Sequence, residues 1–138
     1  MPMSVKMVIP SNIDRIEEAA SFVESNAKKM QFSEPEVDNI VIAITEAISN
    51  AIIHDNQSDE RKKVTIEIIS NHDSMITKVK DEGPGFNLKK IEDPLLPDNL
   101  LKESGRGIFI LNSLLDSVDY SFSDQGTVVT LVKKKPNK

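Results

Sequence analysis

One long apolar stretch, residues 39–54 with the sequence NIVIAITEAISNAIIH, most constrains how this chain can fold. Ser33 and Glu36 precede it at the spacing of a helix capping box, and Pro35 is tolerated in a first helical turn. Isoleucine, valine and alanine fill most of the positions that follow. We therefore expect a buried central helix rather than one with a solvent-exposed face.

Two polar residues interrupt this apolar helix. Glu46 and Asn50 are four positions apart, so both side chains lie on one side of the helix, and His54 continues that side. A carboxylate and an amide buried without partners would destabilise the fold. Either the two side chains satisfy each other inside the core, or they belong to a binding site. The helix by itself leaves both interpretations open.

The composition predicts one soluble domain over residues 1–138. Charged residues make up 28% of the chain and hydrophobic residues 38%, which is enough for a core. The net charge of −5 argues against nucleic-acid binding, and the absence of cysteine excludes disulfides and thiolate metal sites. The sequence shows neither an apolar run of transmembrane length nor a signal-peptide core, so we expect a cytoplasmic protein.

Alternating and helical patterns predict the remaining elements. Strands are expected at residues 3–9, 64–68, 75–81, 118–122 and 127–132, and further helices at about 12–30 and 108–115. The apolar side of the first helix should contain Ile13, Ile16, Ala19, Ala20 and Val23. Strands paired through tight turns, with helices on one face, predict an α/β (α+β) two-layer sandwich with a mixed, mostly antiparallel sheet.

Two glycine-containing segments flank a long polar stretch. Asp81 ends a predicted strand on its core side, directly before Gly83 and Gly85. Gly105 and Gly107 open the helix expected at 108–115. Residues 87–104, between the two segments, lack periodicity and contain prolines, which favours a lid or a binding loop.

These features together favour nucleotide binding. Glycines allow backbone N–H groups to approach phosphates, and the N-terminus of the helix after Gly107 attracts anions. Asn50 offers a neutral oxygen ligand for magnesium, and Asp81 offers an acceptor for the exocyclic amine of adenine. Glu46 is placed to accept a proton from a hydroxyl or water that attacks the γ-phosphate. The sequence is not that of a P-loop protein.

The same residues resemble the motifs of the GHKL (HATPase) superfamily, which includes gyrase, Hsp90, histidine kinases and MutL. Residues 46–54 resemble its N box, 81–86 and 104–108 its two glycine boxes, and 126–127 its closing Gly-Thr. The chain length and the N-terminal strand resemble the RsbW-like anti-sigma-factor serine kinases of bacteria. The resemblance implies a Bergerat fold and the use of ATP and Mg.

The resemblance also implies residue roles. Glu46 matches the catalytic base, and Asn50 matches the magnesium-binding asparagine. The other residues that match the nucleotide site are Asp81, Gly83, Gly85, Gly105, Gly107 and Thr127. Arg106 either contacts phosphate or is solvated, and both readings stay open. Asp55 and Asn56 follow the N box where a glycine is more usual.

The implied function is that of an anti-sigma factor and protein-serine kinase that regulates transcription. Its implied partners are a sigma factor, an anti-anti-sigma (STAS-type) protein that it phosphorylates, and a second copy of itself in a homodimer, with no direct nucleic-acid or membrane partner. Two alternatives are the catalytic module of a split histidine kinase and a nucleotide-binding module without kinase activity. Glu46 argues against the histidine kinase, because a histidine acceptor needs no base whereas a serine hydroxyl does.

Overall fold

The computed structural model describes residues 3–82, 114–123 and 126–135. The expected lid at 87–104 and most of the helix expected at 108–115 lie outside these residues. So do Arg106 and the glycines of the two glycine boxes, which are Gly83, Gly85, Gly105 and Gly107. The side chains of His54 and Asp55 are also outside the description. The predictions for these positions therefore stay predictions.

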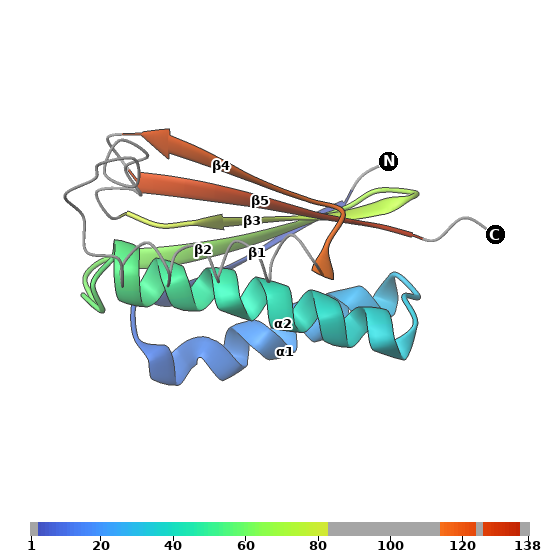
Figure 1. Ribbon diagram of the computed structural model, residues 1–138. Coiled ribbons are helices and arrows are strands. Elements are labelled where there is room, and N and C mark those ends of the chain that lie inside the picture. The colour runs from blue at the N-terminus through green and yellow to red at the C-terminus, as the bar shows by residue number, and fades with distance from the viewer. Residues whose placement is uncertain (1–2, 83–113, 124–125, 136–138) are drawn as a thin grey trace.

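The described strands form one five-stranded sheet. Its strands are β1 (Met3–Pro10), β2 (Lys63–Ser70), β3 (Ser74–Lys80), β4 (Ser117–Ser123) and β5 (Gly126–Lys134). They lie in the order β1-β2-β3-β5-β4, and all four pairings are antiparallel, so the described part of the sheet is not mixed. The two long helices cover one face of this sheet, as the sequence predicts (Figure 1).

The helices are α1 (Ile16–Lys29) and α2 (Glu34–Asn50). A 3-10 turn, η1 (Ile13–Arg15), precedes α1, and Asn12 caps it by accepting a hydrogen bond from the Asp14 amide. The predicted capping box of α2 is present: the Ser33 hydroxyl accepts from the Glu36 amide at 3.3 Å, and the Glu36 carboxylate accepts from the Ser33 amide at 3.0 Å. The last turn of this helix widens into a π-helical turn, η2 (Ala51–Asp55).

The core lies between the helices and the sheet. Alternate residues of the strands point into it, as the period of two requires. Its largest fully buried side chains are Ile9, Ile40, Ile44, Ile48, Ile52, Ile66, Ile68, Met75, Leu131, Val23 and Val64. Leu115 also reaches this core.

The expectation that α2 is buried on all sides is wrong. Ile42 is 51% exposed and Ile53 is 43% exposed, while Ile40 and Ile44 are buried. Within the described residues, the helix packs on α1 and the sheet, while the side that bears Ile42 is exposed (Figure 1). Its apolar composition therefore overstates its burial. Ile13 is likewise 43% exposed, because the 3-10 turn precedes the amphipathic part of α1. No helix in the described residues is long and apolar enough to cross a membrane.

Candidate functional site

Asp81, a described residue predicted to bind nucleotide, is held by hydrogen bonds to a neighbouring strand. It directly follows β3 and is only 7% exposed, on the core side that its strand period predicts. Its amide donates to the Thr127 carbonyl at 3.0 Å, and its Oδ1 accepts from the Thr127 amide at 3.0 Å. Thr127 is 1% exposed on β5. The structure therefore brings together two predicted site residues that are far apart in the sequence.

Gly126 allows this close approach. Its φ of +139° lies in a region that residues with side chains rarely adopt, and a Cβ there would lie 2.0 Å from the Asp81 carbonyl oxygen. The backbone of β5 thus passes against the peptide group that follows Asp81. Only glycine fits at that position without moving one of the two backbones.

Asn56 is a buried residue next to the predicted site, and its contacts were not predicted from the sequence. It is fully buried, and its Nδ2 donates to Ser11 Oγ at 2.8 Å and to the Lys63 carbonyl at 3.2 Å. Its Oδ1 accepts from the Glu82 amide at 3.0 Å. Its own amide donates to the Ala51 carbonyl at 2.9 Å, which closes the π-helical turn. Asn56 belongs to the Asp55-Asn56 pair, which stands where a glycine is more usual, and no pattern in the sequence indicates its hydrogen bonds.

Glu46 and Asn50 lie together on α2, one helical turn apart, and both are half-buried. Among the described residues, no hydrogen bond joins the two side chains, and no buried side-chain polar atom lacks a partner. The structure thus gives no support to a mutually satisfied pair inside the core. Both residues lie on a side of the helix that keeps some access to solvent.

The two halves of the predicted site lie at one end of the domain. The hydrogen bond between Asn56 and Glu82 joins the segment after α2 to the segment after β3. Figure 1 shows the C-terminal end of α2, the end of β3 and the start of β5 at that same end. The end of the helix that carries Asn50 therefore lies at the same end of the domain as the end of the strand that leads to the buried aspartate.

The side-chain oxygens at this end of the domain suit a magnesium ion that is coordinated by the protein and by phosphate together. Within the described residues, no group of three or more His, Cys, Asp or Glu side chains is placed to hold a metal by itself. Magnesium usually keeps several waters and binds through one or two protein oxygens plus substrate phosphates. The half-buried Asn50 amide suits this mode, in which the protein alone does not form a complete metal cage.

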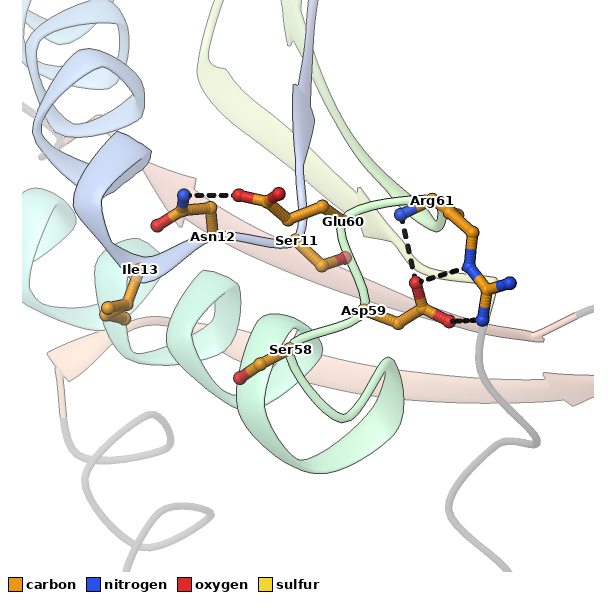
Figure 2. Close-up of a pocket in the computed structure, with 7 residues that line it drawn as sticks. All are labelled: Ser11, Asn12, Ile13, Ser58, Asp59, Glu60 and Arg61. Atoms are coloured by element: carbon orange, nitrogen blue, oxygen red, sulfur yellow. Dashed lines mark hydrogen bonds and ion pairs between the residues drawn. The ribbon is translucent and has the colours of Figure 1, made fainter.

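An open pocket of about 560 Å³ lies between the segment that follows β1 and the loop that follows η2 (Figure 2). Its lining residues are Ser11, Asn12, Ile13, Ser58, Asp59, Glu60 and Arg61. Asn12 Nδ2 donates to Glu60, and Arg61 forms two side-chain hydrogen bonds to Asp59. These bonds to Arg61 lower the pKa of Asp59 below its ordinary value. None of the predicted nucleotide-site residues that the structure describes lines this pocket.

Comparison with known proteins identifies the family. Residues 9–133 match the family model described as a histidine kinase-like ATPase domain. The chain belongs to this family. An anti-sigma F factor of Clostridium perfringens is 38% identical over 105 residues, which cover 74% of each chain. The predicted family is confirmed.

Other relatives place the chain within a group of this ATPase family. The serine-protein kinase RsbW of Oceanobacillus iheyensis is 26% identical over 136 residues, covering 94% of this chain and 85% of the relative. Among solved structures, the RsbU and RsbW domains of a Mycobacterium tuberculosis protein match with a TM-score of 0.69 at 13% identity. That match covers 99% of this chain but 33% of the larger protein, and at such identity it confirms the fold class alone. This ATPase belongs to the group of anti-sigma factors and RsbW-type serine-protein kinases.

Proposed function

We propose that the chain is an anti-sigma factor that also phosphorylates a serine of an anti-anti-sigma protein, with Mg-ATP as phosphoryl donor. The observation that carries the proposal is the pairing of Glu46 and Asn50 on the half-buried side of α2. The C-terminal part of α2, which carries them, ends at the same end of the domain as the strands that bring Asp81 and Thr127 together (Figure 1). An acid, a neutral oxygen ligand and an acceptor for adenine suit a kinase that acts on an unactivated hydroxyl.

Each of these residues has one chemical task in this proposal. Asp81 accepts a hydrogen bond from the adenine amine, and Asn50 holds magnesium through its amide oxygen. Glu46 takes the proton from the serine hydroxyl as the serine oxygen forms its bond to the γ-phosphorus and the bond to the ADP oxygen breaks. Magnesium supplies the positive charge that offsets the charge of the phosphates. Gly83, Gly85, Gly105, Arg106 and Gly107 are proposed to contact the phosphates through the two glycine boxes.

The substitution Glu46→Gln tests the kinase proposal. It keeps the shape of the side chain and removes the base, so nucleotide affinity should stay within a few-fold while phosphoryl transfer falls by roughly 10²–10⁴. The control is Asp38→Asn, an acid-to-amide change at an exposed position of the same helix, which should leave transfer unchanged. The assay follows labelled phosphate from ATP to the anti-anti-sigma protein of the same cell, alongside binding of a fluorescent nucleotide.

Transfer at the wild-type rate by Glu46→Gln would make Glu46 a structural residue. Binding of nucleotide by the wild type without transfer to any such partner would instead favour the alternative, a nucleotide-binding regulatory module. Asn50→Ala should lose metal-dependent binding and transfer together, because the metal ligand serves both.

We further propose a homodimer that uses β1. This strand lies at the edge of the sheet, where Met3 is 71% exposed, Val5 37% and Val8 57%. Exposed apolar edge strands favour pairing with another chain. Sedimentation should show a dimer at tens of micromolar, a rough concentration for moderate affinity. Val8→Lys should shift the protein toward monomer, whereas Lys78→Ala, on a central strand, should not. A wild type that sediments only as a monomer would refute the dimer.

A further inference from the structure

We infer that Asn56 is a positioning residue for recognition of the adenine ring. It holds the peptide group that follows Asp81, and so fixes where the Asp81 carboxylate points. This inference rests on the proposed nucleotide site. It concerns a residue outside the N box and the glycine boxes, in the Asp55-Asn56 pair that stands where a glycine is more usual.

The geometry of one peptide group carries the inference. The carbonyl of Asp81 and the amide of Glu82 belong to the same planar unit. Its carbonyl oxygen lies against Gly126, where a Cβ would come within 2.0 Å. Its amide donates to Asn56 Oδ1 at 3.0 Å. The two edges of this peptide plane therefore contact different parts of the chain, which limits rotation about the Cα–C bond of Asp81.

Asn56 is itself held rigidly. Its side chain is fully buried and makes three hydrogen bonds, to Ser11, Lys63 and Glu82. A buried amide can make at most four such bonds, so this one is nearly saturated. Ser11 is also fully buried, and its hydroxyl donates to the Lys62 carbonyl at 2.7 Å. Because three hydrogen bonds fix the Asn56 side chain, the peptide group that it binds can move little.

The Glu82 side chain adds a second attachment. Its carboxylate accepts a hydrogen bond from the Lys63 amide at the start of β2. The residue after Asp81 is thus held through its own amide by Asn56 and through its side chain by Lys63. Asn56 also closes the π-helical turn six positions after Asn50, the proposed metal ligand. It therefore links the helix that carries Asn50 to the end of the strand that leads to Asp81, the proposed acceptor for adenine.

The substitutions Asn56→Ala and Ser11→Ala separate positioning from general stability. Asn56→Ala removes the acceptor for the Glu82 amide, whereas Ser11→Ala removes a partner of Asn56 and leaves that acceptor in place. Both leave buried polar groups without a partner, so both should destabilise the domain. Only Asn56→Ala should alter the direction of the Asp81 carboxylate.

The decisive readout is the ratio of the affinities for Mg-ADP and Mg-IDP, because IDP lacks the exocyclic amine. Partial unfolding lowers the apparent affinity for both nucleotides by the same fraction, so it leaves the ratio unchanged. Loss of one well-aligned hydrogen bond to a charged group is worth on the order of tenfold in affinity. The ratio should therefore fall about tenfold in Asn56→Ala and stay within about twofold of wild type in Ser11→Ala.

The outcomes are distinguishable. A wild type that binds neither nucleotide contradicts the proposed function itself. A wild type that binds both nucleotides equally overturns the inference, because there is then no amine recognition to position. An Asn56→Ala ratio equal to that of wild type also overturns it, as does an equal fall in Ser11→Ala.

If Asn56→Ala does not fold, Glu82→Pro decides the question. It removes the Glu82 amide hydrogen, which is the donor of the same hydrogen bond, and Glu82 is an exposed residue. Glu82→Ala is its control, because it removes only the side-chain attachment to Lys63 and keeps the amide. A ratio that falls about tenfold in Glu82→Pro, but not in Glu82→Ala, supports the inference. A wild-type ratio in Glu82→Pro, or the same fall in both variants, overturns it.

Discussion

Gly126→Ala should be among the most disruptive single-methyl additions in the described part of the chain. The new Cβ would lie 2.0 Å from the Asp81 carbonyl oxygen and 2.8 Å from its carbon, both backbone atoms that no side-chain rotation can move. The backbone there has φ +139°, where alanine is strained whatever the space. Either β5 or the end of β3 must shift.

The magnitude follows from what that shift breaks. Holding a non-glycine residue in such a backbone region costs about 1–3 kcal/mol. Separating the strands also lengthens the two 3.0 Å bonds between Asp81 and Thr127, and each buried group left without a partner costs about 1–3 kcal/mol. The free energy of unfolding should thus fall by at least about 3 kcal/mol, out of a total of about 5–15 kcal/mol for a typical domain.

Urea denaturation followed by circular dichroism measures this loss, with Thr130→Ala as control. Thr130 lies on the same strand, on the face of the sheet opposite to the buried Val129 and Leu131, and is only partly buried, so its replacement should cost no more than about 1 kcal/mol. If Gly126→Ala unfolds within about 1 kcal/mol of wild type, the tight approach of β5 to the Asp81 peptide is wrong. The folded fraction should also bind Mg-ADP more weakly, because Asp81 has moved.

Three further predictions concern Asp81 as the proposed acceptor for adenine, the cap of α2, and the loop after η2. Asp81→Asn keeps an oxygen for the Thr127 amide but places NH₂ where the second carboxylate oxygen was, so Mg-ADP affinity by calorimetry should fall by roughly tenfold to a hundredfold while the fold is retained. Hydrogen bonds from the Ser33 backbone and hydroxyl lower the pKa of Glu36, so its contribution to stability is present above the unfolded-state pKa of about 4.3 and is lost as pH falls through the lower folded-state pKa. In urea melts, Glu36→Gln should therefore destabilise the protein at pH 7 and progressively less in acid; an equal loss at both pH values would contradict this. Ser58 has φ +55°, so Ser58→Gly should be more stable than Ser58→Val by about 1–2 kcal/mol, and the reverse order would show that this turn is not strained.

Local pattern was sufficient to predict most of the fold. The capping box at Ser33 and Glu36 and the alternation along β2 and β3 each depend on neighbouring residues, and each is observed. The strand period also placed Asp81 on the core side, where it is buried. These features were predictable because the physical interactions that produce them act over a few positions of the chain.

Long-range contacts explain what the sequence could not predict. Nothing near Asn56 indicates that its side chain meets Ser11, Lys63 and Glu82, which are 45, 7 and 26 positions away. The π-helical turn was equally hidden, since the pattern of residues 39–54 suits an uninterrupted α-helix. The exposure of Ile42 depends on which neighbours the fold supplies, and an apolar side chain alone does not indicate them.

The wide turn at the end of α2 explains how one helix can serve both the core and the proposed site. An α-helical amide at position 56 would bond to the Ile52 carbonyl, but the Asn56 amide bonds to the Ala51 carbonyl instead, which places one extra residue in the turn. Ile52 stays fully buried while Asn56 is carried to the ends of β2 and β3. The apolar side of α2 therefore fixes the helix on the sheet, and the π-helical turn fixes its polar side, with Glu46 and Asn50, relative to Asp81. Single-turn π insertions are frequent at functional sites, and here the insertion has a structural reason: without it, the side chain that holds the Glu82 amide would point elsewhere.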